Sequence, residues 1–202
     1  MIIRRSFKFC ASHVVRNCTS TRCSQSLHGH NYKVEVFVKS DSLDFANMVL
    51  DFGILKNEVF DFIDCFDHAT HFWDKEDANF IAFIKNYSKR YVSLPFNASA
   101  ESYALIFFYY IDLILKASDL NNGEDIELYA IRVHETDYGY AEAARSDLER
   151  LGGTLSAKEL SFSNAILDEM RHKDLFAKLE RFLRDGTKQF FYKRPEHQIS
   201  TN

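Results

Sequence analysis

The chain has 202 residues, of which 46% are hydrophobic, so a single domain with a substantial core and room for an appendage is expected. Its net charge of −4 disfavours nucleic acid as the main partner, because a nucleic-acid-binding domain usually carries a basic stripe. We see neither a signal peptide nor an apolar run long enough to span a membrane, and therefore expect a cytoplasmic protein whose four cysteines are not in disulfides.

Two strands are predicted near the N-terminus, over residues 3–15 and 28–40. In the first strand, a period of two places on one face Phe7, Phe9, Ala11 and His13. The second strand places on one face His28, His30, Tyr32, Val34, Val36 and Val38, with Lys33 and Glu35 on the other. The small polar residues 16–27 predict a loop between them, so the two strands should form an antiparallel pair.

Three helices are predicted next, over residues 52–66, 76–88 and 100–117. Ser99 is a plausible N-cap of the third helix, with Glu101 in its first turn. Asn122-Gly123 predicts a turn, after which strands are expected over residues 126–136 and 138–145.

Residues 146–202 have a different character and predict a helical C-terminal extension of two helices. Ser156 and Glu159 form a capping box, and Gly186 is a natural helix end. Strands and helices are segregated along the chain rather than alternating, which favours an α+β fold with an antiparallel sheet.

His28-Gly29-His30 is the strongest local signal for chemistry. Imidazoles at i and i+2 on a strand project from the same face, and Gly29 allows close approach of a backbone or ligand. Antiparallel pairing would bring His13 near both rings, giving three neutral ligands suited to zinc with one open position. The alternatives are ordinary histidines near a turn, or a closed structural zinc site formed by Cys18, Cys23, His28 and His30.

Cys23 precedes this motif, and a thiolate beside a metal and a histidine would be reactive. Cys18 is a weaker candidate for this role, whereas Cys10 and Cys65 fit inert positions better.

Asp67-His68 follows the first predicted helix and could form a proton relay, with His71 as an alternative histidine. Glu135 ends the third predicted strand, where its carboxylate could accept paired N–H donors from a flat heterocycle or could simply be solvated.

Together these residues resemble the 6-pyruvoyltetrahydropterin synthase superfamily over roughly residues 3–140. The matching segments, in family order, are Phe7–His13, Cys23, Leu27–Tyr32, Met48–Phe52 with Leu55 and Lys56, Phe66–His68, Ser99–Glu101 and His134–Thr136. The combination is more specific than any single segment.

The resemblance implies a tunnelling fold (T-fold), an antiparallel four-stranded sheet with two helices on one face. It also implies a homohexamer of two stacked trimers with active sites between subunits. We expect a pterin-synthase domain over residues 1–145, containing an insertion at 72–98, followed by the extension at 146–202.

By the same resemblance, His13, His28 and His30 would bind Zn²⁺, and Cys23, Asp67 and His68 would be catalytic. Glu135 would anchor the pterin ring, with Ser99 and Glu101 in the same pocket. Zinc would acidify a C–H of 7,8-dihydroneopterin triphosphate, Cys23 and His68 would transfer protons on opposite sides of that carbon, and triphosphate would leave. No phosphate-binding residues are implied; Arg16, Arg22, Lys89 and Arg90 are basic residues near the matched segments.

The expected activity is that of the carboxy-forming branch, which makes 6-carboxy-5,6,7,8-tetrahydropterin for queuosine biosynthesis and also releases acetaldehyde. The alternatives are a pyruvoyl-forming synthase, a folate-branch variant that leaves a hydroxymethyl pterin, and a non-enzymatic module with structural zinc. The sequence departs from the family pattern by placing four residues between Cys23 and His28, where the pyruvoyl branch has five and the carboxy branch three. Ser99 also stands where Thr is usual.

Overall fold

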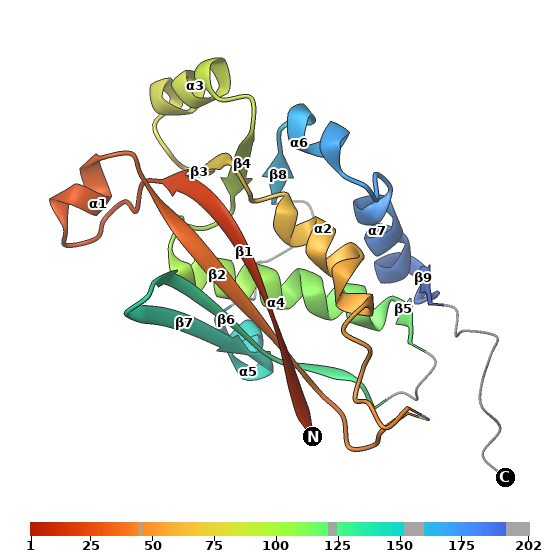
Figure 1. Cartoon of the computed structure of the whole chain (residues 1–202). Coiled ribbons are helices and arrows are strands. Elements are labelled where there is room, and N and C mark those ends of the chain that lie inside the picture. The colour runs from red at the N-terminus through yellow and green to blue at the C-terminus, as the bar shows by residue number, and fades with distance from the viewer. Residues whose placement is uncertain (45, 121–124, 152–159, 193–202) are drawn as a thin grey trace, which may run out of the picture.

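The computed structural model describes residues 1–44, 46–120, 125–151 and 160–192. A seven-stranded sheet runs in the order β7-β6-β2-β1-β3-β4-β8 through the molecule (Figure 1). Its strands are β1 (Ile2–His13), β2 (His28–Lys39), β3 (Ala69–Trp73), β4 (Tyr91–Leu94), β6 (Glu127–Thr136), β7 (Gly139–Ala144) and β8 (Ser161–Phe162). The short strands β5 (Ser118–Asp119) and β9 (Phe190–Phe191) pair separately.

The expected four-stranded antiparallel sheet is confirmed as β7-β6-β2-β1, and helices α2 (Glu58–Asp64) and α4 (Ala100–Lys116) cover one face of it (Figure 1). The predicted alternation is confirmed on both long strands. The core-facing side chains are Phe7, Phe9 and Ala11 from β1 and Tyr32, Val34, Val36 and Val38 from β2, all buried. Burial of this apolar face is the main driving force for closing the helices over the sheet.

Three strands beyond this core were not predicted. β3 pairs parallel with β1, β4 pairs parallel with β3, and β8 closes the edge in antiparallel fashion. The first four residues of β3 are all buried, so the segment lacks the period of two that reveals a half-exposed strand. The predicted insertion therefore extends the sheet as well as adding a helix.

Two local predictions need correction. The helix expected over residues 52–66 is a 3-10 turn, η1 (Ile54–Lys56), followed by α2, because Asn57 has a non-helical backbone between them. The loop expected over 16–27 contains a short helix, α1 (Thr21–Gln25), which buries no residue. A helix without an apolar face leaves no hydrophobic pattern in the sequence.

The helices expected over 76–88 and 100–117 are confirmed as α3 (Ala78–Tyr87) and α4, and the Ser99 side chain caps α4 by accepting from the Ser102 N–H at 3.3 Å. On α3 only Ile84 is buried, whereas Phe83 and Tyr87 are exposed. Among the described residues, no helix is long and apolar enough to cross a membrane.

The described residues from 145 onward contain three helices rather than the two expected, namely α5 (Arg145–Leu151), α6 (Asn164–Glu169) and α7 (Leu175–Asp185). Leu175 and Leu179 are buried in the same hydrophobic core as the sheet, so the extension docks on the body of its own chain. Gly186 ends α7 in the left-handed conformation, as predicted. The Asn122-Gly123 turn and the Ser156–Glu159 capping box lie outside the described residues.

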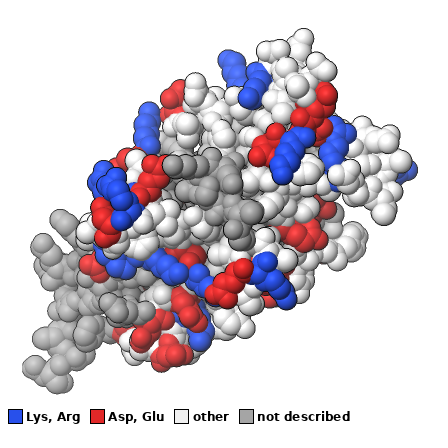
Figure 2. All heavy atoms as spheres, turned by 180° about the vertical axis from the view of Figure 1, so that it is seen from behind, with Lys and Arg blue, Asp and Glu red and all other residues white. Residues whose placement is uncertain are grey.

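Charged side chains are mixed on the surface seen from behind in Figure 2. Lys and Arg are interspersed with Asp and Glu among the described residues of this face. Lys39 with Glu127, at 3.1 Å, is one example of such pairing. Exposed pairs of this kind contribute little to stability.

His71, the alternative relay histidine, is instead a fully buried core residue on β3. Its Nε2–H donates to the Phe66 carbonyl at 3.0 Å, and its Nδ1 accepts from the Tyr103 hydroxyl at 2.7 Å. Burial lowers the pKa of His71 from 6.5 to about 3, so the ring is neutral at physiological pH.

This burial predicts a specific acid sensitivity of folding. Below pH 6.5 the unfolded chain protonates His71 whereas the folded chain does not until about pH 3, so stability falls as pH drops through that window. His71→Gln should reduce the slope of unfolding free energy against pH by about 1.4 kcal/mol per pH unit near pH 5. Urea unfolding measured across that range tests this. Tyr103→Phe, which keeps the imidazole, should retain the wild-type slope, and equal slopes for wild type and His71→Gln would contradict the account.

Candidate active site

Three histidines meet where β1 ends and β2 begins. His13 pairs with His28 and Ala11 pairs with His30 in the antiparallel register, so the predicted parity places all three rings on one face. The ring centroids lie 4.6 Å (His13–His28), 5.2 Å (His13–His30) and 5.1 Å (His28–His30) apart. One nitrogen from each ring lies within 4.8 Å of the others, a group that could hold a metal ion.

Backbone carbonyls fix the orientation of two of these rings. His13 Nδ1–H donates to the Ala98 carbonyl at 2.6 Å, and His28 Nδ1–H donates to the Ser26 carbonyl at 2.9 Å. Each contact leaves Nε2 as the nitrogen available for a ligand, which is the usual outer support of a metal-binding histidine. His28 Nε2 is buried and has no hydrogen-bond partner, as expected of an atom whose partner is a cation.

Burial also keeps two of the rings, those of His13 and His30, uncharged. It lowers the pKa of His13 to about 4, and it lowers the pKa of His30. Neutral imidazoles are the form that ligates metals, so the donor set fits a cation such as zinc. Gly29 permits the close strand contact, because a Cβ there would lie only 3.0 Å from the Ala11 carbonyl oxygen.

The candidate metal group among the described residues contains histidines only. The closed site considered from sequence, with Cys18 and Cys23 as ligands, is therefore not assembled in this structure. A three-histidine group leaves a coordination position for water or substrate, the arrangement found in catalytic zinc sites.

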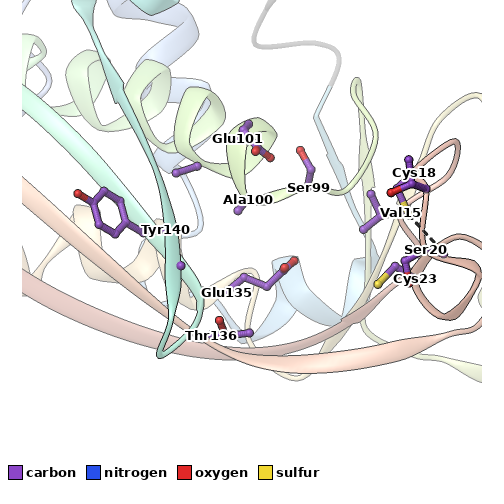
Figure 3. A pocket seen from close by; sticks show the side chains of 13 residues that line it. Val15, Cys18, Ser20, Cys23, Ser99, Ala100, Glu101, Glu135, Thr136 and Tyr140 are labelled. Atoms are coloured by element: carbon purple, nitrogen blue, oxygen red, sulfur yellow. Dashed lines mark hydrogen bonds between the residues drawn. The ribbon is translucent and has the colours of Figure 1, made fainter.

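A pocket of about 380 Å³ (Figure 3) is lined by Glu135, whose Oε1 lies 3.7 Å from His13 Nε2. It brings together four of the predicted residues, Cys23, Ser99, Glu101 and Glu135. In Figure 3 the Cys23 thiol and the Glu135 carboxylate extend into the same space from opposite sides, below the first turn of α4. Cys18 lines this pocket too, but its thiol donates to the Ser20 carbonyl at 3.3 Å.

Glu135 lies next to the metal-binding group, at an irregular point of β6 between His134 and Thr136. Its Oε1 is 3.7 Å from His13 Nε2 and accepts from the Tyr32 hydroxyl at 3.5 Å. Tyr32 is fully buried, and burial raises the pKa of its hydroxyl, so it remains a protonated donor. Sequence reasoning treated Tyr32 only as a core residue and missed this contact with Glu135.

Asp67 and His68 form the predicted pair. The His68 Nδ1–H donates to Asp67 Oδ2 at 2.7 Å, while Asp67 Oδ1 accepts from the Cys10 N–H at 2.6 Å. His68 has a φ of 52° and donates its backbone N–H to the Cys10 carbonyl at 2.7 Å. A left-handed backbone at a non-glycine residue is held by its surroundings, so this pair is a positioned unit.

The pair does not share the pocket of Cys23 within one chain. His68 lines a separate hollow of about 350 Å³. The side chains of Cys10, Ser12 and Asn31 line it from the side of β1 and β2 opposite to His13 and His28, and His30 also lines it. The side chain of His68 is 77% exposed there. Cys10, expected to be inert, is thus exposed in this hollow, whereas Cys65 is buried, and burial raises the pKa of its thiol.

Two of the four basic residues near the matched segments are engaged by carboxylates. Arg16 pairs with Glu76 at 2.6 Å, and Arg90 pairs with Glu169 of α6. Arg90 also donates through Nε to the Asp67 carbonyl at 3.0 Å. These arginines therefore support the loops of the site, a role that sequence reasoning missed because their partners lie far along the chain.

Comparison with known proteins agrees with this geometry. The family model for 6-pyruvoyl tetrahydropterin synthase matches residues 2–146. A protein of Helicobacter pylori strain J99 named 6-carboxy-5,6,7,8-tetrahydropterin synthase is 50% identical over 98% of this chain and 100% of its own length. A protein of the same name from Haemophilus influenzae is 27% identical over 69% of this chain and 96% of its own.

Solved structures show the same fold at lower sequence identity. An uncharacterized protein from Wolinella succinogenes matches with a TM-score of 0.56 and 19% identity, covering 72% of this chain and 98% of that one. The 6-pyruvoyl tetrahydropterin synthase of Plasmodium vivax matches with a TM-score of 0.53 and 17% identity over the same shares. The sheet with its two helices is thus the T-fold, and the chain belongs to the 6-pyruvoyl tetrahydropterin synthase family.

Proposed function

We propose that this chain is a zinc-dependent 6-carboxy-5,6,7,8-tetrahydropterin synthase. It would convert 7,8-dihydroneopterin triphosphate and one water to 6-carboxy-5,6,7,8-tetrahydropterin, acetaldehyde and triphosphate, as a cytoplasmic lyase of queuosine biosynthesis. The observation that carries the proposal is the group of three histidines next to Glu135, whose carboxylate lines a pocket together with the Cys23 thiol. The 50% identical relative of that name supports the choice of product.

His13, His28 and His30 would hold the zinc, with the outer nitrogens of His13 and His28 bound to carbonyls. When bound, zinc supplies a Lewis acid that polarises substrate hydroxyls and makes an adjacent C–H more acidic. Glu135 would bind the pterin ring by accepting paired N–H donors, with the Tyr32 hydroxyl orienting its carboxylate. Ser99 and Glu101 would line the same pocket.

Cys23 and His68 would transfer the protons. The Cys23 thiolate at the pocket edge would accept a proton at Sγ. His68 would exchange the second proton at Nε2, because its Nδ1–H is bound to Asp67. Asp67 would thereby fix the tautomer and stabilise the protonated ring.

The separation of these two groups supports a site shared between subunits. Cys23 and His68 line different hollows on opposite sides of β1 and β2, so one chain does not present both to the same carbon. We propose a homohexamer of two stacked trimers, in which Cys23 and Glu135 of one subunit work with Asp67 and His68 of a neighbour.

Product analysis tests the function directly. Purified protein given 7,8-dihydroneopterin triphosphate should release acetaldehyde and triphosphate in equal amounts, because loss of the two-carbon fragment distinguishes the carboxy-forming reaction. Enzymatic detection of acetaldehyde together with chromatography of the pterin measures both. Triphosphate without acetaldehyde would overturn the proposal in favour of a pyruvoyl-forming synthase, and a hydroxymethyl pterin would indicate the folate-branch reaction.

Metal content separates catalytic from structural zinc. His28→Ala should lose the metal and the activity, since it removes a ligand. Cys23→Ala should keep the metal and lose roughly 100-fold or more in kcat, the scale of a missing acid–base group. Elemental analysis and kinetics on both variants measure this. Loss of the metal and the fold in Cys23→Ala would instead indicate the structural module.

Mixed oligomers test the shared site. Cys23→Ala and His68→Ala, each inactive alone, should regain activity when denatured and refolded together, because about a quarter of random neighbour pairs restore an intact site. The matched control mixes Cys23→Ala with Glu135→Gln, which damage the same pocket and should give no recovery. Absence of recovery in the first mixture would refute sharing.

A further inference from the structure

The loop that carries Cys23 has little stability of its own. Helix α1 has five residues, buries none of them and has no side-chain N-cap. A helix this short is marginal in water without tertiary support. The bond from the Val15 N–H to the Cys23 carbonyl, at 2.9 Å, closes the loop but does not tie it to the rest of the molecule.

Arg16 makes the connection between this loop and the body of the protein. Its NH1 donates to the Ser24 carbonyl at 2.7 Å, and its Nε donates to Glu76 Oε2 at 2.6 Å. Its guanidinium also lies over the Phe80 ring, 5.2 Å from the centroid. One planar guanidinium thus joins the residue after Cys23 to two residues of the 72–98 segment.

Both ends of the 72–98 segment hold Arg16. Glu76 precedes α3, its side chain is only 8% exposed, and its other oxygen accepts from the Asp77 N–H at 3.0 Å. Asn97, between β4 and α4, accepts from the Arg16 N–H at 3.0 Å and donates to the Arg16 carbonyl. Backbone and side chain of Arg16 are therefore both fixed.

We infer that the inserted 72–98 segment is a brace that positions the Cys23 thiol, with Arg16 and Glu76 as positioning residues. The inference rests on the proposed catalytic role of Cys23. It gives the segment a function beyond extending the sheet, and it explains how a loop with an unusual spacing to His28 can hold a thiol at a defined place. The half-buried, charge-assisted contact between Arg16 and Glu76 is the strongest link in the brace.

The test is the Glu76→Gln variant, which keeps the shape of the side chain but removes its charge. Alkylation of each cysteine by iodoacetamide, followed peptide by peptide by mass spectrometry, reports the mobility of the loop without any need for enzymatic turnover. We expect Cys23 to react roughly 10-fold faster, as befits loss of one charge-assisted hydrogen bond, while exposed Cys10 on β1 reacts at the wild-type rate. Turnover, where present, should fall in kcat far more than KM rises.

Two further variants complete the experiment. Glu127→Gln makes the same substitution in the ion pair with Lys39 at the far end of β6, and it should leave Cys23 reactivity unchanged. Arg16→Lys keeps the charge but lacks the fork that reaches Glu76 and Ser24 together, so it should accelerate Cys23 alkylation as well. Arg16→Lys also tests the same contact if Glu76→Gln fails to fold.

Cys23 alkylation within twofold of wild type in both Glu76→Gln and Arg16→Lys would overturn the brace. The wild type could instead release neither acetaldehyde nor triphosphate while Cys23 is alkylated faster in both variants. That result would support the brace and refute the proposed function. The two failures are therefore distinguishable.

Discussion

The antiparallel register between β1 and β2 is the constraint on which the site depends. It sets His13 opposite His28 and His30 opposite Ala11, so three imidazoles converge at one end of the sheet. A slip of one residue would turn His13 to the other face. The same faces of β1 and β2 carry buried apolar side chains such as Phe9 and Val38. A slip would expose these side chains to water, so their burial resists it.

The same sheet divides the proposed catalytic groups. The pocket with Cys23 and Glu135 opens beside α4, whereas His68 lies in the hollow on the other side of β1 and β2. Parallel pairing of β3 with β1 fixes this arrangement, since Ala69 follows His68 directly and pairs with Ala11. This separation within one chain is the physical basis for the shared site proposed above.

Much of the sheet and of the histidine group could be predicted from the sequence, for reasons that differ between elements. The long strands β1, β2 and β6 alternate because one face is buried, and His13, His28 and His30 follow from the same parity. The short parallel strands β3 and β4 lack such a period, and their pairing with β1 is not local, so they were missed. The grouping of Cys23 with Glu135 came from the family resemblance, and no local pattern signals that Glu76 and Asn97 hold Arg16.

Two arginines connect loops of the site to segments that lie far along the chain. Arg90 joins α6 to the Asp67 carbonyl, and Arg16 joins the 72–98 segment to the Cys23 loop. The catalytic role proposed for the site depends on the histidines holding a cation. Anomalous diffraction at the zinc edge, from crystals grown with zinc, tests that claim most directly. The account predicts one peak about 2.0–2.1 Å from a ring nitrogen of each histidine, with a solvent molecule in the fourth position. A peak bonded to the Cys23 sulfur, or no peak between the three rings, would contradict it.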